Sequence, residues 1–295
     1  MARILVISSQ VARGHVGLSA IVPACQALGH EVIALPTILL SNHPGHAHAA
    51  GERIAPAALS RMLDALDANG WLADIDGVLT GYLPSPEHVQ FAVEAVERVR
   101  ASSPRVVYVC DAILGDLPKG LYIAPEAATA LRDGLVGRAD ILKGNAFEIG
   151  WLAGPPIDDV HTLAEAARRQ GWRDVIATSV RRPTPGELSN VWLSEGAPPL
   201  EITVAERSAV PKGTGDLLSA LLLGHILAVD RPTTSDARER VLSRAVANAQ
   251  AVVEASIGRE DLHLVAALDQ IRASKRARLL RSPYSRRRSA DRTQS

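Results

Sequence analysis

Short apolar runs alternate with longer amphipathic stretches along the first two thirds of the chain. The runs are rich in Val, Ile and Leu and have the length of buried strands. We expect strands at residues 3–8, 31–35, 77–80, 105–110, 140–142, 175–178, 190–193 and 200–204. Gly196-Ala197-Pro198-Pro199 lies between the last two strands and favours a turn, so this pair is expected to form an antiparallel hairpin at a sheet edge.

Helical periodicity fills the intervals between these runs and continues through the last third of the chain. We expect helices at residues 18–28, 56–67, 86–100, 124–132, 146–153, 162–170, 214–229, 234–257 and 262–274. The helix that begins at Thr214 has a wide apolar face and should be deeply buried. That face consists of Leu217, Leu218, Leu221, Leu222 and Ile226.

Alternating strands and helices predict an α/β fold of three layers, with a mainly parallel central sheet and helices on both faces. We see no internal repeat and no break in composition that would mark a second domain. The sequence therefore predicts one domain over residues 1–274, followed by a basic tail at 275–295.

The composition is that of a globular enzyme, with 47% hydrophobic and 22% charged residues in a chain of 295. The net charge is zero, yet nine Lys/Arg and one acid lie between Arg272 and Ser295, so the remainder is acidic. An acidic body argues against general nucleic-acid binding. The tail is expected to be disordered and solvated, with contacts to RNA, acidic lipid or the body as the alternative.

Two cysteines, Cys25 and Cys110, lie in apolar contexts and form no CxxC motif, so no disulfide framework is expected. No apolar run has the length needed to span a bilayer. The apolar run at residues 4–7 continues into Ser8, Ser9 and Gln10, which is typical of a buried strand and not of a signal peptide. We therefore expect a cytoplasmic protein.

One short motif carries candidate chemistry: Gly213-Thr214-Gly215-Asp216, directly before the buried helix. Glycines allow the backbone to approach a ligand closely, and the free N–H groups of a helix start favour phosphate. A carboxylate there would repel phosphate, which suggests that Asp216 accepts a proton from an alcohol that attacks phosphorus. The alternative is that Asp216 is an ordinary first-turn acid. No Walker A sequence is present.

The segment from Val210 to Leu222 resembles the signature of the ribokinase-like superfamily, whose GxGD carries a catalytic aspartate and an anion hole. Further segments resemble the pyridoxal kinases of that superfamily, in the order in which that family has them. They are residues 4–20, Ser41-Asn42-His43, Leu79-Thr80-Gly81-Tyr82, residues 111–116 and Asn145-Ala146-Phe147-Glu148. The resemblance covers residues 4 to about 225.

The resemblance implies a three-layer ribokinase-like fold and ATP-dependent phosphorylation of the 5′-hydroxyl of pyridoxal, with pyridoxine and pyridoxamine as further substrates. It implies that Asp216 is the general base and that N–H groups of Gly213, Thr214 and Gly215 form the anion hole. It also implies a homodimer.

The resemblance further assigns binding roles. Mg²⁺ would be held by Asp116 and Glu148. The nucleotide side would comprise Asp111, Lys143, Thr178, Ser179 and Lys212, and the substrate side Ser9, His43, Pro44 and Tyr82. Without this context, Tyr82 would be read as a core or rim aromatic, and His43, His46 and His48 as a polar loop more readily than as metal ligands.

The chain also departs from the family pattern. Arg13 replaces a usual Tyr, Leu18 a usual Asn, Pro44 a frequent Thr, and Ala112 a usual Pro. Lys143-Gly144 stands where the family has Thr-Pro, in a region that commonly helps to house a monovalent cation. We hypothesise that Lys143 supplies that charge or reaches the triphosphate, the alternative being a solvent-facing lysine.

Arg13 and Pro44 bear on the substrate. Arg13 is a candidate to pair with a substrate phenolate or carboxylate, or to close over the nucleotide phosphates. Two other functions stay open at this point: a hydroxymethylpyrimidine kinase or another ribokinase-like kinase, and a catalytically weak module that binds pyridoxal or its phosphate.

Overall fold

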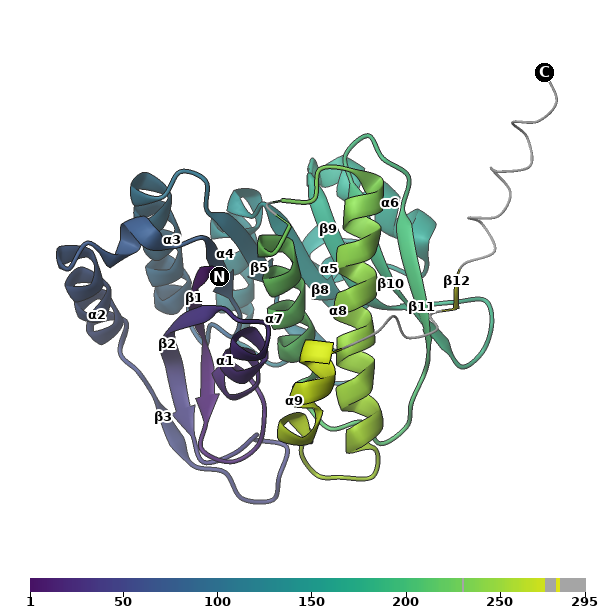
Figure 1. Ribbon diagram of the computed structural model, residues 1–295, viewed down its shortest axis with the longest axis horizontal. Coiled ribbons are helices and arrows are strands. Elements are labelled where there is room, and N and C mark those ends of the chain that lie inside the picture. The colour runs from purple at the N-terminus through teal and green to yellow at the C-terminus, as the bar shows by residue number, and fades with distance from the viewer. Residues whose placement is uncertain (230, 274–279, 282–295) are drawn as a thin grey trace.

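The computed structural model describes residues 1–229, 231–273 and 280–281. One large sheet runs through the middle of the molecule, and helices cover both of its faces (Figure 1). This is the three-layer α/β arrangement that the alternating pattern predicts.

The sheet has ten strands within the described residues, in the order β12-β11-β10-β9-β8-β5-β4-β1-β2-β3. Strands β2, β1, β4, β5, β8 and β9 are parallel, whereas β3, β10, β11 and β12 run antiparallel to their neighbours. The bounds are β1 Arg3–Val11, β2 Glu31–Leu40, β3 Gly51–Arg53, β4 Gly77–Thr80, β5 Val107–Asp111, β8 Ile141–Asn145, β9 Asp174–Arg181, β10 Glu187–Ser194, β11 Leu200–Ala205 and β12 Leu280–Arg281. A separate two-stranded ribbon pairs β6 (Gly115–Asp116) with β7 (Gly120–Leu121).

Two groups of helices form the outer layers, each packed in its own apolar cluster. One layer contains α2 Pro56–Ala68, α3 Pro86–Ser102, α4 Pro125–Gly134, α5 Ala146–Ala153 and α6 Val160–Gln170. The other contains α1 Leu18–Ala27, α7 Thr214–Leu227, α8 Ser235–Ser256 and α9 Leu264–Ala273. Short 3₁₀ turns lie at Trp71–Asp74 and Val136–Arg138. Figure 1 shows α7 and α8 side by side over the sheet.

Strand β1 shows how one sequence serves both layers. Successive side chains of a strand point to opposite faces. Leu5 and Ile7 accordingly pack in the α2–α6 cluster, while Ile4 and Val6 pack in the cluster of α1 and α7. All four side chains are fully buried, which explains why the strand appears in the sequence as a continuous apolar run.

Most expected elements are present with shifted ends. The helix over residues 146–153 and the strand over 77–80 have the expected bounds, and β10 and β11 form the expected antiparallel hairpin. Strands β1 and β2 are longer than expected because they remain paired past a register shift between Ser8 and Gln10, as far as Val11 and Leu40. Strands β3, β6 and β7 were not expected, since two or three residues carry no periodic signal.

The tail expectation falls mainly on residues outside those described. Of the segment 275–295, the structure describes only Leu280–Arg281, which pair with Ile202 and Thr203 of β11. The predicted disorder of the tail and its candidate contacts therefore stay predictions.

Candidate active site

The parallel strands bring several candidate residues together at the end of the sheet where the strands have their carboxyl ends. Asp111 is the last residue of β5, and Lys143 lies opposite it in β8, as direct partners in the register. Paired residues of parallel strands project to the same face. Val109 and Ile141, two residues earlier, pack in the cluster of α7, so Asp111 and Lys143 face α7. The carboxyl ends of such strands are where α/β folds bind ligands.

Lys143 is the centre of a buried polar cluster. Its Nζ lies 3.0 and 3.1 Å from the two carboxylate oxygens of Asp111 and 3.2 Å from the carbonyl oxygen of Gly215. The Lys143 and Asp111 side chains are 4% and 3% exposed. Ser219 of α7 donates its hydroxyl to Asp111 Oδ2 at 2.6 Å. The alternative of a solvent-facing lysine is therefore wrong.

Burial by itself would lower the pKa of Lys143, but the carboxylates of Asp111 and Glu148 outweigh it and raise the pKa. Lys143 is therefore a permanent ammonium. It lies among Asp111, Glu148 and Asp216, and its charge partly offsets the rise in the pKa of Glu148 and of Asp216.

The glycine motif forms the first turn of α7, and Gly213 is its N-terminal cap in a left-handed conformation, with φ of 102°. A Cβ on Gly213 would lie 2.0 Å from the carbonyl oxygen of His15. Only glycine fits there, because the loop at Gly14–Gly17 packs directly on the motif. The first N–H groups of α7 have no partner within the helix, and this is the arrangement that binds phosphate.

Asp216, the expected base, lies in the first turn of α7. The residue is partly exposed, but its Oδ1 atom is buried and has no hydrogen-bond partner in the described structure. Burial raises the pKa of the carboxyl to about 6, aided by the charge of Asp111 and opposed by the Gly17 N–H and by Lys143. At neutral pH the carboxylate is mostly ionised and has a free acceptor atom.

Glu148 is held at the start of α5 by a capping box with Asn145. Asn145 accepts from the Glu148 N–H at 2.9 Å, and Glu148 Oε2 accepts from the Asn145 N–H at 2.7 Å. Oε1 accepts from the N–H groups of Leu114 and Gly115. Burial, with the charge of Asp111, raises the pKa of Glu148 to about 8.

Asp116 is the more accessible carboxylate of the two expected to hold Mg²⁺. Its side chain is 32% exposed and lies 3.3 Å from Lys212 Nζ, and it also hydrogen-bonds the side chain of Tyr122. Mg²⁺ prefers oxygens and retains water. Asp116 fits that preference directly, whereas the backbone N–H groups around Glu148 leave it a role through solvent.

The residues expected on the substrate side lie in β1 and in the segments that follow β2 and β4. A Cβ on Gly17 would approach both the carbonyl and the hydroxyl of Ser9, so Ser9 lies under the Gly14–Gly17 loop. The Tyr82 N–H donates to Ser8 Oγ, and burial raises the pKa of the half-buried Tyr82. His43 is partly buried near Lys212, and burial followed by that positive charge lowers its pKa. Pro44 is exposed.

Thr178 and Ser179 lie near the end of β9. Thr178 pairs in register with Asn145, which brings it beside the β8–α5 turn. Ser179 is exposed and has a left-handed φ of 56°. This conformation turns the backbone just after Thr178, where the parallel pairing of β9 with β8 ends.

Sequence reasoning missed several neighbours of the site. Ser219 was not singled out, although it is the one polar residue between Asp216 and Leu223, and that contrast was the available signal. Arg13 pairs with Glu260 and Asp261 at 3.1 and 3.4 Å, and His46 approaches Asp261 at 3.7 Å. No local pattern connects residues so far apart in the chain.

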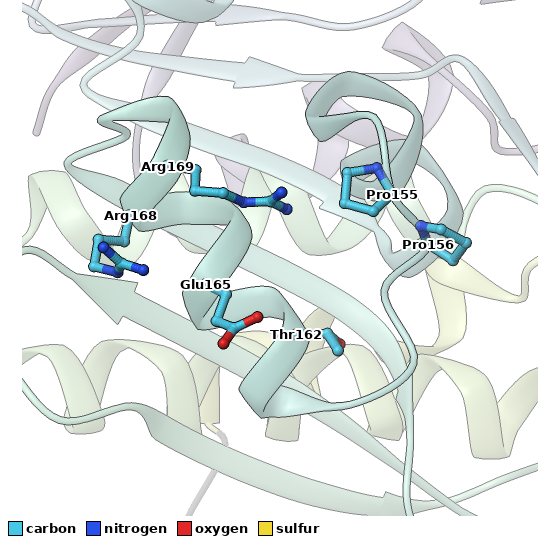
Figure 2. A pocket seen from close by; sticks show the side chains of 6 residues that line it. All are labelled: Pro155, Pro156, Thr162, Glu165, Arg168 and Arg169. Atoms are coloured by element: carbon cyan, nitrogen blue, oxygen red, sulfur yellow. The ribbon is translucent and has the colours of Figure 1, made fainter.

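A surface hollow elsewhere in the molecule contains none of these residues. It is formed by α6 and the segment before it, as Figure 2 shows. Its lining residues are Pro155, Pro156, Thr162, Glu165, Arg168 and Arg169. Among the described residues, no group of three or more His, Cys, Asp or Glu side chains is arranged to hold a metal ion. Within that same part of the chain, no helix is both long and apolar enough to cross a bilayer.

A three-layer α/β fold, a GxGD helix start with one buried carboxylate oxygen that has no hydrogen-bond partner, and the lack of a Walker A sequence are typical of a ribokinase-like small-molecule kinase. The family model for phosphomethylpyrimidine kinase matches residues 14–267. Pyridoxal kinase of Leifsonia xyli subsp. xyli is 37% identical over 237 residues, covering 79% of this chain and 84% of that protein. The enzyme of Corynebacterium diphtheriae is 34% identical over 228 residues, covering 76% and 81%.

The crystal structure of pyridoxal kinase from Leishmania donovani with ADP and pyridoxamine has a TM-score of 0.84 and 27% identity, covering 95% of this chain and 99% of that one. The chain belongs to the phosphomethylpyrimidine kinase family and, within it, to the pyridoxal kinases. The expected fold and family are confirmed.

Proposed function

We propose that this protein transfers the γ-phosphoryl group of ATP to the 5′-hydroxyl of pyridoxal, and also of pyridoxine and pyridoxamine, in vitamin B6 salvage. The relatives named above are pyridoxal kinases, and the Leishmania enzyme binds ADP and pyridoxamine. The observation that supports the reaction most directly is Asp216, whose buried Oδ1 has no partner at the phosphate-binding start of α7.

The proposed reaction follows from this geometry. Asp216 accepts the hydroxyl proton as the alcohol oxygen forms a bond to the γ-phosphorus and the bond from phosphorus to the ADP oxygen breaks. The N–H groups of Gly213, Thr214 and Gly215 stabilise charge on the transferring group. The products are the phosphate ester and ADP, and the proton leaves from Asp216.

The substrate end is proposed to consist of Ser9, His43, Pro44 and Tyr82. Ser9 would hydrogen-bond the pyridine ring, and Tyr82 would pack against it. Pairing of Arg13 with Glu260 and Asp261 argues against Arg13 as a direct substrate ligand and for a role in joining the Gly14–Gly17 loop to the α8–α9 segment.

The nucleotide end is proposed to involve Thr178, Ser179 and Lys212. Mg²⁺ arrives with ATP as part of the substrate, with Asp116 as its protein ligand and Glu148 acting through water. Lys212 would leave Asp116 for the phosphates once Mg²⁺ occupies that position, since the Lys212–Asp116 pair is at the surface and of low strength.

We also propose that Lys143 replaces the monovalent cation of related enzymes. The ammonium is buried against Asp111 and the Gly215 carbonyl, which are oxygen ligands of the kind that potassium prefers. Wild-type turnover is expected to be equal in potassium and tetramethylammonium buffers of the same ionic strength. Strong activation by K⁺ would contradict this proposal.

Replacement of Asp216 tests the enzyme function. We expect Asp216→Asn to lower kcat by about 10²- to 10⁴-fold while ADP affinity changes little. The base is lost, but the segment Gly213–Gly215, called the anion loop below, is kept. Asp236→Asn is the matched control, because Asp236 is a first-turn acid of α8 and exposed. Equal turnover of the Asp216 variant and wild type would remove Asp216 as the base and favour a binding module.

The second candidate function is a hydroxymethylpyrimidine kinase, favoured by the family model that matches residues 14–267. Both functions would use Asp216 and the anion loop but different groups around Ser9, Pro44 and Tyr82. Parallel assays with pyridoxal and hydroxymethylpyrimidine, at saturating ATP, separate them. A higher kcat/KM for hydroxymethylpyrimidine would overturn the pyridoxal proposal.

The homodimer and the cytoplasmic location expected from the sequence stay predictions. Light scattering after gel filtration should give twice the 31.3 kDa of one chain. A single-chain mass at micromolar concentration would contradict the dimer. Cell fractionation tests the location.

A further inference from the structure

The buried cluster around Lys143 joins three elements that are distant in sequence. Asp111 ends β5, Lys143 belongs to β8, and Gly215 lies in the first turn of α7. Lys143 Nζ contacts both Asp111 oxygens and the Gly215 carbonyl, at 3.0 to 3.2 Å. Ser219 Oγ contacts the same two residues, at 2.6 Å from Asp111 Oδ2 and 3.0 Å from the Gly215 carbonyl. The Gly215 carbonyl is therefore held from two sides.

The orientation of this carbonyl fixes the orientation of the next N–H group. The peptide unit is planar and trans, so the Asp216 N–H points away from the Gly215 carbonyl. Lys143 holds the carbonyl toward the sheet, and the N–H of the same peptide, which points the opposite way, hydrogen-bonds the carboxyl of Asp216. Asp216 itself, the proposed base, follows directly in the chain.

Charge supports the same role. Removing Lys143 would remove the positive charge that lies among Asp111, Glu148 and Asp216. The pKa of Asp216 would then rise further, because Lys143 favours its charged form. Direct contact of Lys143 with the triphosphate would require it to leave all of its partners, because its side chain is only 4% exposed.

We propose that Lys143 is a positioning residue for phosphoryl transfer: it orients the Gly215–Asp216 peptide at the start of α7, which leads directly to the proposed base, and it places a fixed positive charge beside that base. This rests on the proposed kinase function. It differs from a merely structural ion pair, because the loss of Lys143 should affect the chemical step more than nucleotide binding or folding.

The first test compares kcat, ADP affinity and melting temperature in Lys143→Met and in Lys119→Met. Lys119 is exposed in the β6–β7 turn and controls for the loss of one positive charge near the site. We expect Lys143→Met to lower kcat by about 10²- to 10³-fold, as for loss of an oriented oxyanion donor, with ADP affinity within about threefold. A kcat within threefold of wild type would overturn the proposal.

The second test is chemical rescue. Lys143→Ala lacks the atoms that propylammonium would restore, so propylammonium chloride should raise its kcat at least about tenfold, as expected when an oriented donor is returned. Tetramethylammonium chloride, a cation with no N–H group, should not. Equal effects of the two salts would show that no oriented ammonium is needed and would overturn the proposal.

Lys143→Met can fail to fold, because it leaves Asp111 buried and unpaired. The double variant Asp111→Asn/Lys143→Met keeps the shape of the cluster without net charge and decides that case. Full turnover by a folded double variant would limit Lys143 to a structural role, and a loss of at least about 100-fold would support the proposal.

If wild type phosphorylates only hydroxymethylpyrimidine, the proposed substrate is wrong, but the same variants still test the role of Lys143 with hydroxymethylpyrimidine as the substrate.

Discussion

At the scale of single residues, the site depends on how burial alters ordinary side chains. Asp216 and Lys143 have ordinary side-chain chemistry. The fold leaves one carboxylate oxygen of Asp216 buried without a hydrogen-bond partner, and it gives the ammonium of Lys143 fixed partners. Burial raises the pKa of Asp216 to about 6, which suits the proposed base, while the Gly17 N–H and Lys143 oppose that rise.

The pH dependence of turnover follows from Asp216. Burial raises its pKa to about 6, and only the ionised form accepts a proton. We therefore expect kcat/KM for pyridoxal to be near its maximum above pH 7 and to fall about tenfold per pH unit well below pH 6. In Lys143→Met this acid limb should move to higher pH, since a neighbouring positive charge is lost. A profile that is flat down to pH 5 would contradict the assignment.

At the scale of elements, the packing of the Gly14–Gly17 loop on the start of α7 shapes the anion loop. Gly213 permits this contact in two ways, by its left-handed φ and by the absence of a Cβ. The loop in turn supplies the Gly17 N–H to Asp216. Small changes at this junction should therefore act on catalysis and stability together.

Two glycine variants separate crowding from backbone strain. Gly213→Ala would place a Cβ 2.0 Å from the His15 carbonyl, whereas Gly258→Ala, with φ of 74°, would meet no atom within 4 Å. We expect Gly258→Ala to cost about 1–2 kcal/mol, the strain of a left-handed residue, with normal kcat. Gly213→Ala should cost more and abolish turnover. Urea unfolding and kcat measure both effects, and equal costs would contradict the crowding.

At the scale of the whole molecule, two histidines link α7 to the elements beside it: His30, which is buried, and His225, which is partly buried. His30 accepts from the Ala2 N–H through Nδ1, and its Nε2 lies 3.0 Å from the Gly224 carbonyl of α7. His225 of α7 contacts Asn248 of α8 at 2.8 Å. Burial lowers the pKa of both imidazoles, which are therefore neutral in the folded protein at neutral pH.

These histidines should make the fold sensitive to acid. A pKa that is lower in the folded state gives stability that is present above the unfolded value of about 6.5 and is lost as the pH falls through the folded value. The free energy of unfolding in urea should thus decrease between pH 7.5 and 5.5. The decrease should be smaller in His30→Gln but unchanged in His161→Gln, whose side chain is 79% exposed. Identical decreases in all three proteins would contradict this origin.

Sequence alone determined the order of layers and the reaction class. Buried strands such as Ile4–Ile7 and the leucines after Asp216 can be recognised in the sequence, because elements buried on all sides are continuous apolar runs. The Gly213–Asp216 motif likewise specifies its own backbone, because its glycines and its helix start are adjacent in the chain. The roles proposed for Ser9, His43, Pro44, Thr178, Ser179, Lys212 and Asp116 stay predictions.

Only the tertiary structure decided which groups Lys143 contacts. Its neighbours Asp111 and Ser219 come from β5 and α7, and the carbonyl that it holds belongs to Gly215, so no window of sequence contains the cluster. The same is true of Arg13 with Asp261 and of His15 with Gly213. Whether a lysine faces solvent or a buried carboxylate depends on strand register and on the helix that covers it, and both are settled by packing across the whole chain.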